Sequence, residues 1–206
     1  MARDADLQIE NIHAPVHEQN SLSLDNEQGN HVFHEYLKCV EDCHTHHIPT
    51  VVIHLPDDSF PINDIGNRRL DRIIDKAGSL DVNIAFENLR NVGNLSSVLD
   101  RVTFSHVGYC YDSCHHINYA PDTDLLKLYG NRLKALHLQD NGGSHNQHQL
   151  PYDGKVNWPV VMEKIKQTGY SGAIMLEPMN WDYTHLDIRQ FLRLACERAK
   201  RLEQML

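Results

Sequence analysis

The segment IAFENLRN, residues 84–91, is a short apolar run that ends in a carboxylate, Glu87, and an amide, Asn88. Because its side chains are apolar on both faces, the run predicts a strand buried in a parallel sheet. Other apolar runs also end in His, Asp or Glu, side chains that can bind a metal ion or transfer a proton. They are residues 7–16 with His13, 50–56 with His54, 106–116 with Asp112 and His115, 133–141 with His137 and Asp140, and 172–179 with Glu177.

Helical patterns separate these runs. Apolar residues recur at helical spacing in residues 30–43, 64–77, 95–99, 125–129, 159–169 and 186–206. Single strands that alternate with crossover-length segments predict an α/β protein with a parallel sheet and helices outside it. Six strands are expected. Each of these strands ends in a side chain that can bind a metal ion or transfer a proton. In an open doubly wound sheet the ligand-binding residues gather at one switch point, whereas in a barrel they ring the strand ends, so a TIM-barrel-like (β/α) barrel is favoured.

Length, composition and charge narrow the class of protein. The 206 residues are 41% hydrophobic, which predicts a single globular domain over residues 1–206. The 19 basic and 28 acidic residues give a net charge of -9, which argues against nucleic acid as the main partner. The sequence lacks an apolar stretch of the ~20 residues that a membrane helix needs, and lacks a signal-peptide segment. A cytoplasmic protein with no membrane contact is therefore expected.

Two further features lie close to the strand ends. Residues 140–158 are the longest stretch without a predicted element, and such loops are usually functional. Trp158 at its end is expected to pack as an anchor. Trp181 and Tyr183 follow Glu177 and are equally compatible with lining a sugar face and with packing in the core.

Four of the residues at strand ends suit one divalent cation. Taken singly, each is weak evidence, because a lone His after a strand is more often a structural group than a ligand. Together they combine three carboxylates with one imidazole, a set that suits Mn²⁺, Mg²⁺, Co²⁺ or Zn²⁺. Without a cation, carboxylates that converge in one pocket would repel one another and raise each other's pKa. The predicted ligands are Glu87, Asp112, His137 and Glu177.

The same motifs carry a family resemblance. HAP, VVIH, IAFENL, DSCHH, HLQDN with HQLPYDGKVNW, and MLEP follow one another from about residue 7 onward. In this order they resemble the sugar-phosphate isomerase/epimerase superfamily of xylose isomerase-like TIM barrels. The resemblance implies a metal at the mouth of the barrel, held by the four ligands above. It also implies a small sugar-like substrate.

In the isomerases and epimerases of that superfamily, the two glutamates also face the substrate carbon. Glu87 and Glu177 would therefore be the catalytic acid and base, one removing a proton and the other returning it through an enediolate. His115 matches a position that contacts substrate oxygen or a second metal. His13, His54 and His148 are implied to contact substrate or a second metal as well.

The superfamily also includes apurinic/apyrimidinic endonucleases of the endonuclease IV type, which use three zinc ions to hydrolyse phosphodiesters. The Asp of their Asp-x-His pair falls on Asn146, whose neutral amide is a poorer ligand for a cation than a carboxylate, so the third metal site lacks one ligand. The net negative charge also argues against binding to DNA, and so against this activity. Two alternatives to the isomerase or epimerase remain open. One is an enzyme that hydrolyses phosphodiesters at abasic DNA, and the other is a degenerate fragment that binds metal or sugar without turnover. The endonuclease ligand pattern can be followed in His13, His54, Glu87, Asp112, His115, His137, His148 and Glu177.

Two departures from the superfamily stand out. Its barrels have eight strands, and the HAP strand is normally the third, so the first two βα units are expected to be missing. The resulting gap would expose two sheet edges. We expect it to be covered by a homodimer, by the N-terminal segment or by a missing portion of the natural gene product. In addition, Gly142 and Gly143 stand where 3-epimerases of free ketoses carry an Arg, so that activity is not favoured.

Overall fold

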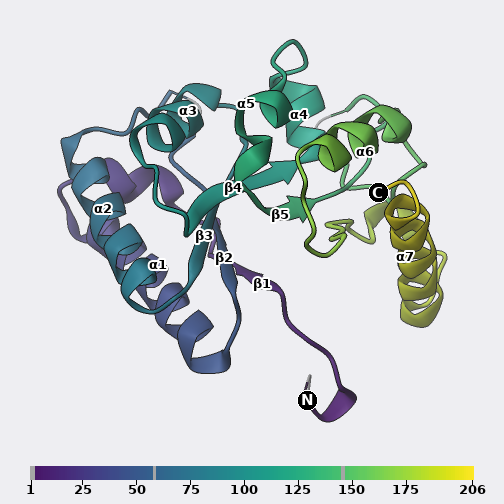
Figure 1. The fold of residues 1–206 in the computed structure, drawn as a ribbon, viewed down its shortest axis with the longest axis horizontal. Coiled ribbons are helices and arrows are strands. Elements are labelled where there is room, and N and C mark those ends of the chain that lie inside the picture. The colour runs from purple at the N-terminus through teal and green to yellow at the C-terminus, as the bar shows by residue number, and fades with distance from the viewer. Residues whose placement is uncertain (1–2, 58, 145–146) are drawn as a thin grey trace. The chain divides into compact units, whose positions relative to one another are not determined.

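The computed structural model describes residues 3–57, 59–144 and 147–206. The chain divides into two compact units, Met1–Tyr109 and Cys110–Leu206, and the boundary between them falls inside a strand. Helices and strands alternate along the chain (Figure 1). The expected α/β order is therefore confirmed, whereas the expectation of one domain over residues 1–206 stays a prediction.

Parallel strands form the centre of the first unit. β1 (Asn11–His13), β2 (Thr50–Ile53) and β3 (Asn83–Glu87) pair in chain order, with His13 opposite Val52 and Ile53 opposite Phe86. All of β2 and most of β3 are buried, as expected for strands covered on both faces. Because parallel neighbours run in the same direction, the residues that end these strands emerge at one edge.

The helices of the first unit begin at asparagine caps. They are α1 (Glu27–His46), α2 (Asp64–Ser79) and α3 (Val92–Arg101). Asn26, Asn63 and Asn91 each accept a hydrogen bond from a backbone N–H in the first turn, a contact worth about 1 kcal/mol. The cap at Asn26 explains why α1 begins before the first apolar residue of the predicted helix. α1 and α2 pack side by side (Figure 1).

A buried arginine ties the loop before α1 to this helical layer. Short 3-10 turns η1 (Arg3–Ala5) and η2 (Gln19–Ser23) precede α1. Arg69 on α2 donates to the carbonyl oxygens of Leu22 and Leu24 at 2.6 and 2.7 Å and to Asn30 at 2.7 Å. Its guanidinium therefore supplies hydrogen-bond donors to two backbone carbonyl oxygens of this loop.

The second unit continues the alternation. β4 (Val107–Asp112) crosses the unit boundary, and the sheet order is β1-β2-β3-β4-β5. Trp158 at the start of α6 is 1% exposed, which confirms that it packs as an anchor. The remaining elements are α4 (Ser113–Tyr119), α5 (Leu125–Tyr129), η3 (Gly130–Arg132), β5 (Leu133–His137), α6 (Trp158–Gln167), η4 (Trp181–Tyr183) and α7 (Ile188–Glu203).

The expected number of strands is wrong: the described chain has five, not six. Residues 172–176 make a single parallel bridge, between Leu138 and Leu176. Its hydrogen bonds run from the Leu138 N–H to the Met175 carbonyl at 2.9 Å and from the Glu177 N–H to the Leu138 carbonyl at 3.2 Å. The next N–H in register, that of Met179, donates to the His148 carbonyl oxygen at 2.8 Å, and Asp140 pairs with Gln149, so the ladder ends here.

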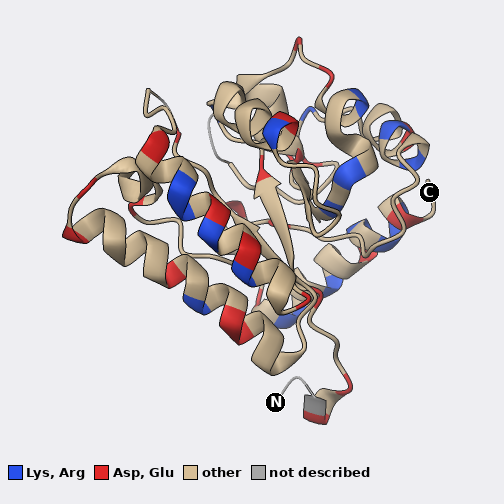
Figure 2. Ribbon diagram, turned by 60° about the vertical axis from the view of Figure 1, so that its left-hand side comes forward, with Lys and Arg blue, Asp and Glu red and all other residues tan. Residues whose placement is uncertain are grey.

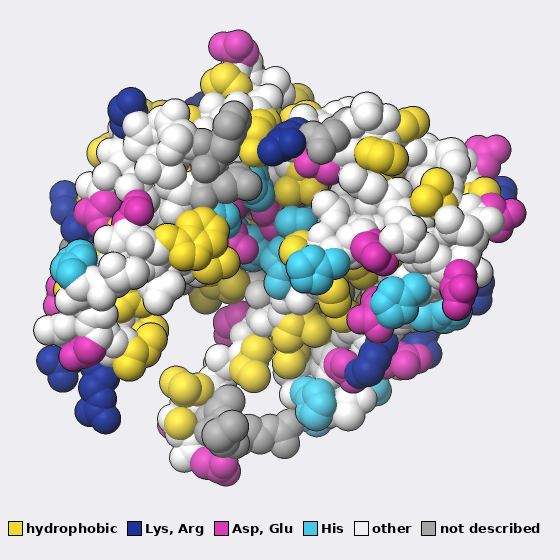
Figure 3. All heavy atoms as spheres, turned by 180° about the vertical axis from the view of Figure 1, so that it is seen from behind, with side chains coloured by type: hydrophobic (Ala, Val, Ile, Leu, Met, Phe, Trp, Pro, Cys, Tyr) yellow, Lys and Arg dark blue, Asp and Glu magenta, His cyan; other side chains and the backbone are white. Residues whose placement is uncertain are grey.

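The surface carries mixed charge. Lys and Arg are interspersed with Asp and Glu along α2 (Figure 2), and ion pairs join Lys76 to Glu41 at 2.9 Å and Arg101 to Asp71 at 2.6 Å. Several of the 15 His side chains are visible at the surface in Figure 3. Each helix within the described residues is too short or too polar to cross a membrane.

Candidate metal centre

Three ligand-type side chains meet at the strand ends of the first unit. His13 ends β1, Glu87 ends β3, and His54 directly follows β2. His13 Nε2 lies 3.2 Å from His54 Nε2 and 3.4 Å from Glu87 Oε2. His54 Nε2 lies 3.3 Å from the same oxygen. The three atoms thus form a nearly equilateral triangle, with one oxygen of the Glu87 carboxylate at a corner, and Glu87 is 1% exposed.

The dimensions of this triangle fit a metal ion. In a tetrahedral zinc site with bonds of about 2.0–2.1 Å, two ligand atoms lie about 3.3–3.4 Å apart. His13 Nδ1 lies 2.6 Å from the Ala14 carbonyl oxygen, which can only accept a hydrogen bond. A proton on Nδ1 leaves Nε2 with its lone pair directed at the triangle, as in a metal-ligating histidine.

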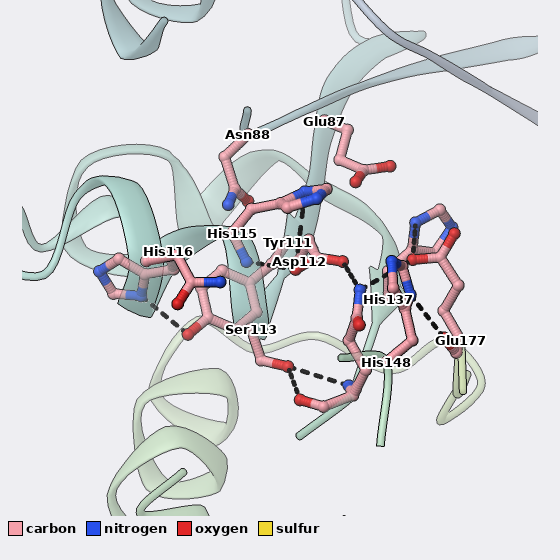
Figure 4. A network of polar contacts seen from close by, with 12 residues as sticks. Glu87, Asn88, Tyr111, Asp112, Ser113, His115, His116, His137, His148 and Glu177 are labelled. Atoms are coloured by element: carbon pink, nitrogen blue, oxygen red, sulfur yellow. Dashed lines mark hydrogen bonds and ion pairs between the residues drawn. The ribbon is translucent and has the colours of Figure 1, made fainter. Parts of the chain in front are cut away.

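A second group of ligand-type side chains lies in the second unit (Figure 4). Asp112 ends β4, His137 ends β5, and Glu177 follows the bridge to Leu138. Each offers a ligand atom within 4.8 Å of the other two, and His137 Nδ1 lies 3.6 Å from Glu177 Oε2. The side chains of Asp112 and His137 are 0% and 6% exposed, whereas that of Glu177 is 30% exposed. Glu177 is therefore the member that solvent can reach.

Two other predicted site residues lie beside this second group. The N–H of His115 donates to Asp112 Oδ1 at 2.6 Å, which caps α4, and the ring of His115 stacks on Tyr119. His148 Nδ1 lies 3.1 Å from the carbonyl oxygen of Glu177 (Figure 4). Among the described residues, the clusters of ligand atoms within 4.8 Å include neither His115 nor His148. Asn146 lies outside the described residues.

Sequence reasoning missed two polar residues that contact the second group. The Gln139 amide nitrogen Nε2 lies 2.6 Å from Asp112 Oδ2 and 3.1 Å from Glu177 Oε2, and Gln139 is fully buried. Ser113, also fully buried, bonds to the backbone of Gln139. One signal was present: Gln139 follows His137 by two positions, and residues two apart on an extended chain project to the same side.

Asp140 organises the long loop that follows β5. Its carboxylate is fully buried and accepts four hydrogen bonds of 2.8–3.0 Å. A Cβ atom on Gly154 would lie 2.3 Å from Asp140 Oδ1, so this position requires glycine. The donors to Asp140 are the N–H groups of Asn141, Tyr152 and Val156 and the indole Nε1 of Trp158.

The two aromatic residues after Glu177 have different environments. Tyr183 is 8% exposed, and its hydroxyl accepts from the Leu150 N–H at 2.8 Å and donates to Asp153 at 2.9 Å. Trp181 is 57% exposed, and its ring meets that of His148 edge-on at 5.6 Å. Tyr183 therefore packs in the core, while Trp181 offers an aromatic surface next to His148.

A half-buried histidine in the same unit predicts that the stability of the fold is sensitive to acid. The Tyr111 hydroxyl lies 2.8 Å from His116 Nδ1, and His116 Nε2 lies 2.8 Å from the Thr123 carbonyl oxygen. Since a carbonyl only accepts, Nε2 carries a proton, and in the neutral ring Nδ1 accepts from the Tyr111 hydroxyl. Burial lowers the pKa of His116 below its ordinary value of 6.5.

The pKa of His116 is lower in the folded state than in the unfolded state. The contribution of the neutral His116 ring to the free energy of unfolding is therefore complete above pH 6.5, and it is lost as the pH falls below that value. We expect the urea midpoint to fall less between about pH 7.5 and pH 5.5 in His116→Gln than in the wild type. His34→Gln, at an exposed position on α1, should keep the wild-type pH dependence. Equal pH dependence in all three proteins would contradict the prediction.

Comparison with known proteins gives matches over most of the chain. Residues 1–202 match a family model described as xylose isomerase-like TIM barrel. The uncharacterized protein y4fM of Sinorhizobium fredii is 32% identical over 174 residues, covering 76% of this chain and 55% of its own length. The uncharacterized protein MJ1311 of Methanocaldococcus jannaschii is 24% identical over 188 residues, covering 82% and 64%. The chain thus spans 55–64% of the length of these relatives.

Solved structures resemble the fold at low sequence identity. D-psicose 3-epimerase from Clostridium cellulolyticum H10, solved with D-tagatose, aligns with a TM-score of 0.80 at 18% identity, over 100% of this chain and 81% of its own. The IolI protein with a binding zinc atom aligns with a TM-score of 0.77 at 18% identity, over 93% and 74%. These likenesses show the fold alone. The fold is TIM-barrel-like and incomplete: residues 3–57, 59–144 and 147–206 contain five parallel strands, where a full barrel has eight.

Proposed function

The chain belongs to the xylose isomerase-like TIM barrel family, and from that premise we propose that it is a metal-dependent isomerase or epimerase. Its substrate would be a sugar or a related polyhydroxy carbonyl compound. The observation that carries the proposal is the group of Asp112, His137 and Glu177, in which donor atoms from two carboxylates and an imidazole lie within 4.8 Å of one another. Sugar epimerases among the structural neighbours support the substrate class.

In this proposal, Glu87 is the fourth ligand of the same cation. Support comes from its position at the end of a parallel strand and from the family motif IAFENL that contains it. The donor set of three carboxylates and one imidazole suits Mn²⁺, Mg²⁺, Co²⁺ or Zn²⁺. Without such an ion, the carboxylates would repel one another.

The chemistry follows from the carboxylates. A divalent cation held there would polarise a substrate carbonyl and its neighbouring hydroxyl. Glu177, which is partly exposed, would accept the proton from the adjacent carbon, and Glu87, which is buried, would return a proton to the substrate. His115 and His148 would contact substrate oxygens.

The test is metal-dependent exchange of a carbon-bound proton with solvent. The protein is freed of metal with a chelator, supplied separately with Mn²⁺, Co²⁺, Mg²⁺ and Zn²⁺, and incubated in D₂O with a panel of aldoses, ketoses and their phosphates. The proposal predicts deuterium at the carbon next to the carbonyl, observed by NMR, only when a metal is present. Absence of exchange with every metal and sugar would contradict it.

One observation favours a second candidate function. The triangle of His13, His54 and Glu87 is sized for a metal ion of its own, as a multi-metal phosphodiester hydrolase requires. Metal analysis separates the two candidates, because the isomerase needs one bound ion and the hydrolase two or three. Cleavage of an abasic duplex without sugar exchange would reverse the ranking. Metal binding with neither activity would indicate a binding fragment.

A further inference from the structure

We propose that Gln139 is a positioning residue that fixes the Asp112 and Glu177 carboxylates at the separation a divalent cation requires. The inference rests on the proposed function, because it assigns Gln139 a role at the same metal centre. Gln139 is fully buried, so its side chain acts through the two carboxylates.

The first support is the chemistry of the contact. Gln139 Nε2 lies 2.6 Å from Asp112 Oδ2 and 3.1 Å from Glu177 Oε2. An amide NH₂ group has two hydrogens, one for each carboxylate. The opposite orientation of the amide would direct its oxygen at two carboxylate oxygens, which repel it, so the orientation follows from the partners.

The second support is the way the backbone of Gln139 is held. The Ser113 hydroxyl donates to the Gln139 carbonyl oxygen at 2.7 Å and accepts from the Gln139 N–H at 3.0 Å. Ser113 directly follows Asp112 in the chain (Figure 4). The backbone and the side chain of Gln139 are therefore both attached to the Asp112–Ser113 pair, so the amide cannot shift without breaking these contacts.

The third support is that the amide is neutral. Two carboxylates that approach the same point need a donor between them. A Lys or Arg there would supply the donor but would also repel the metal ion, whereas an amide leaves the charge of both carboxylates available to it. Within the described part of the chain, Gln139 Oε1 is buried without a hydrogen-bond donor. A buried oxygen without a donor lowers the free energy of unfolding. This is consistent with an amide that is retained because its NH₂ group donates to the two carboxylates.

The test measures metal binding directly. Gln139→Leu removes both donors at similar size, and Gln149→Leu is the matched control, because Gln149 donates to the exposed Asp182 at 2.9 Å. Each full-length protein is titrated with Co²⁺, and its visible absorption spectrum is recorded. We expect Gln139→Leu to lower Co²⁺ affinity about 10- to 100-fold and to change the spectrum, as loss of a hydrogen bond to a metal ligand does. Gln149→Leu should match the wild type.

A second variant covers the case in which Gln139→Leu does not fold, as judged by circular dichroism. Ser113→Ala frees the Gln139 backbone, and we expect it to change the Co²⁺ spectrum with a smaller loss of affinity. Wild-type affinity and spectrum in the folded Gln139→Leu protein, or in Ser113→Ala if that is the variant that folds, would overturn the inference and leave the proposed function standing. A wild-type protein that binds no Co²⁺ and exchanges no sugar proton would instead overturn the proposed function.

Discussion

Glu177→Gln is expected to lower metal-dependent exchange of the sugar C–H proton by about a thousandfold, the scale of a positioned general base. The amide has nearly the same size as the carboxylate but cannot accept the proton. Its oxygen can still accept from Gln139, so the neighbouring contacts should persist. The rate is measured by NMR as deuterium incorporation in D₂O.

Metal content has to be measured on the same samples, because Glu177 is also a proposed ligand. Glu163→Gln is the matched control, since Glu163 lies exposed on α6 and accepts from Gln167 at 2.9 Å. Glu163→Gln should exchange at the wild-type rate. If metal-loaded Glu177→Gln exchanged at a rate close to the wild type, Glu177 would not be the base.

Asp140→Ala is expected to reduce the free energy of unfolding by about 3–5 kcal/mol, because it leaves several buried donors without an acceptor. Three backbone N–H groups and the Trp158 indole lose their partner together. Asp140→Asn should also destabilise the fold, since its NH₂ group faces two of these donors. Urea unfolding followed by tryptophan fluorescence measures the loss.

The control for Asp140 is Asp182→Ala. Asp182 is exposed and accepts one hydrogen bond, from Gln149, so its loss should change stability by no more than about 0.5 kcal/mol. Equal stability of Asp140→Ala and Asp182→Ala would show that the loop does not depend on the buried carboxylate.

The order of the elements was predictable because apolar runs and helical spacing are local signals. The runs around Val52, Phe86 and Cys110 became buried parallel strands, as expected. The run at residues 172–176 shows the limit of this reasoning. Its composition resembles a strand, but strand length depends on pairing with a neighbour, and here the pairing is confined to one bridge.

The positions of the candidate site residues at strand ends were predictable from the sequence, but most hydrogen bonds between them and their neighbours were not. His13, His54 and Glu87 end successive strands of one sheet, so their approach follows from the parallel order. Most contacts of the Gln139 and Asp140 side chains do not follow, because they join residues 12 or more positions apart in the chain. The different environments of Trp181 and Tyr183 depend on the partner at Leu150, which spacing alone does not reveal.

The attachment of the loop after β5 to Asp140 has a consequence for evolution. Because the carboxylate bonds mainly to backbone N–H groups, it restrains the path of the loop with little regard to which side chains the loop carries. Exposed positions such as Ser144 and Lys155 can therefore diverge between descendants of a common ancestor while the scaffold persists. Point substitutions at such positions can then accumulate without changing the path of the loop, provided that Gly154 is retained.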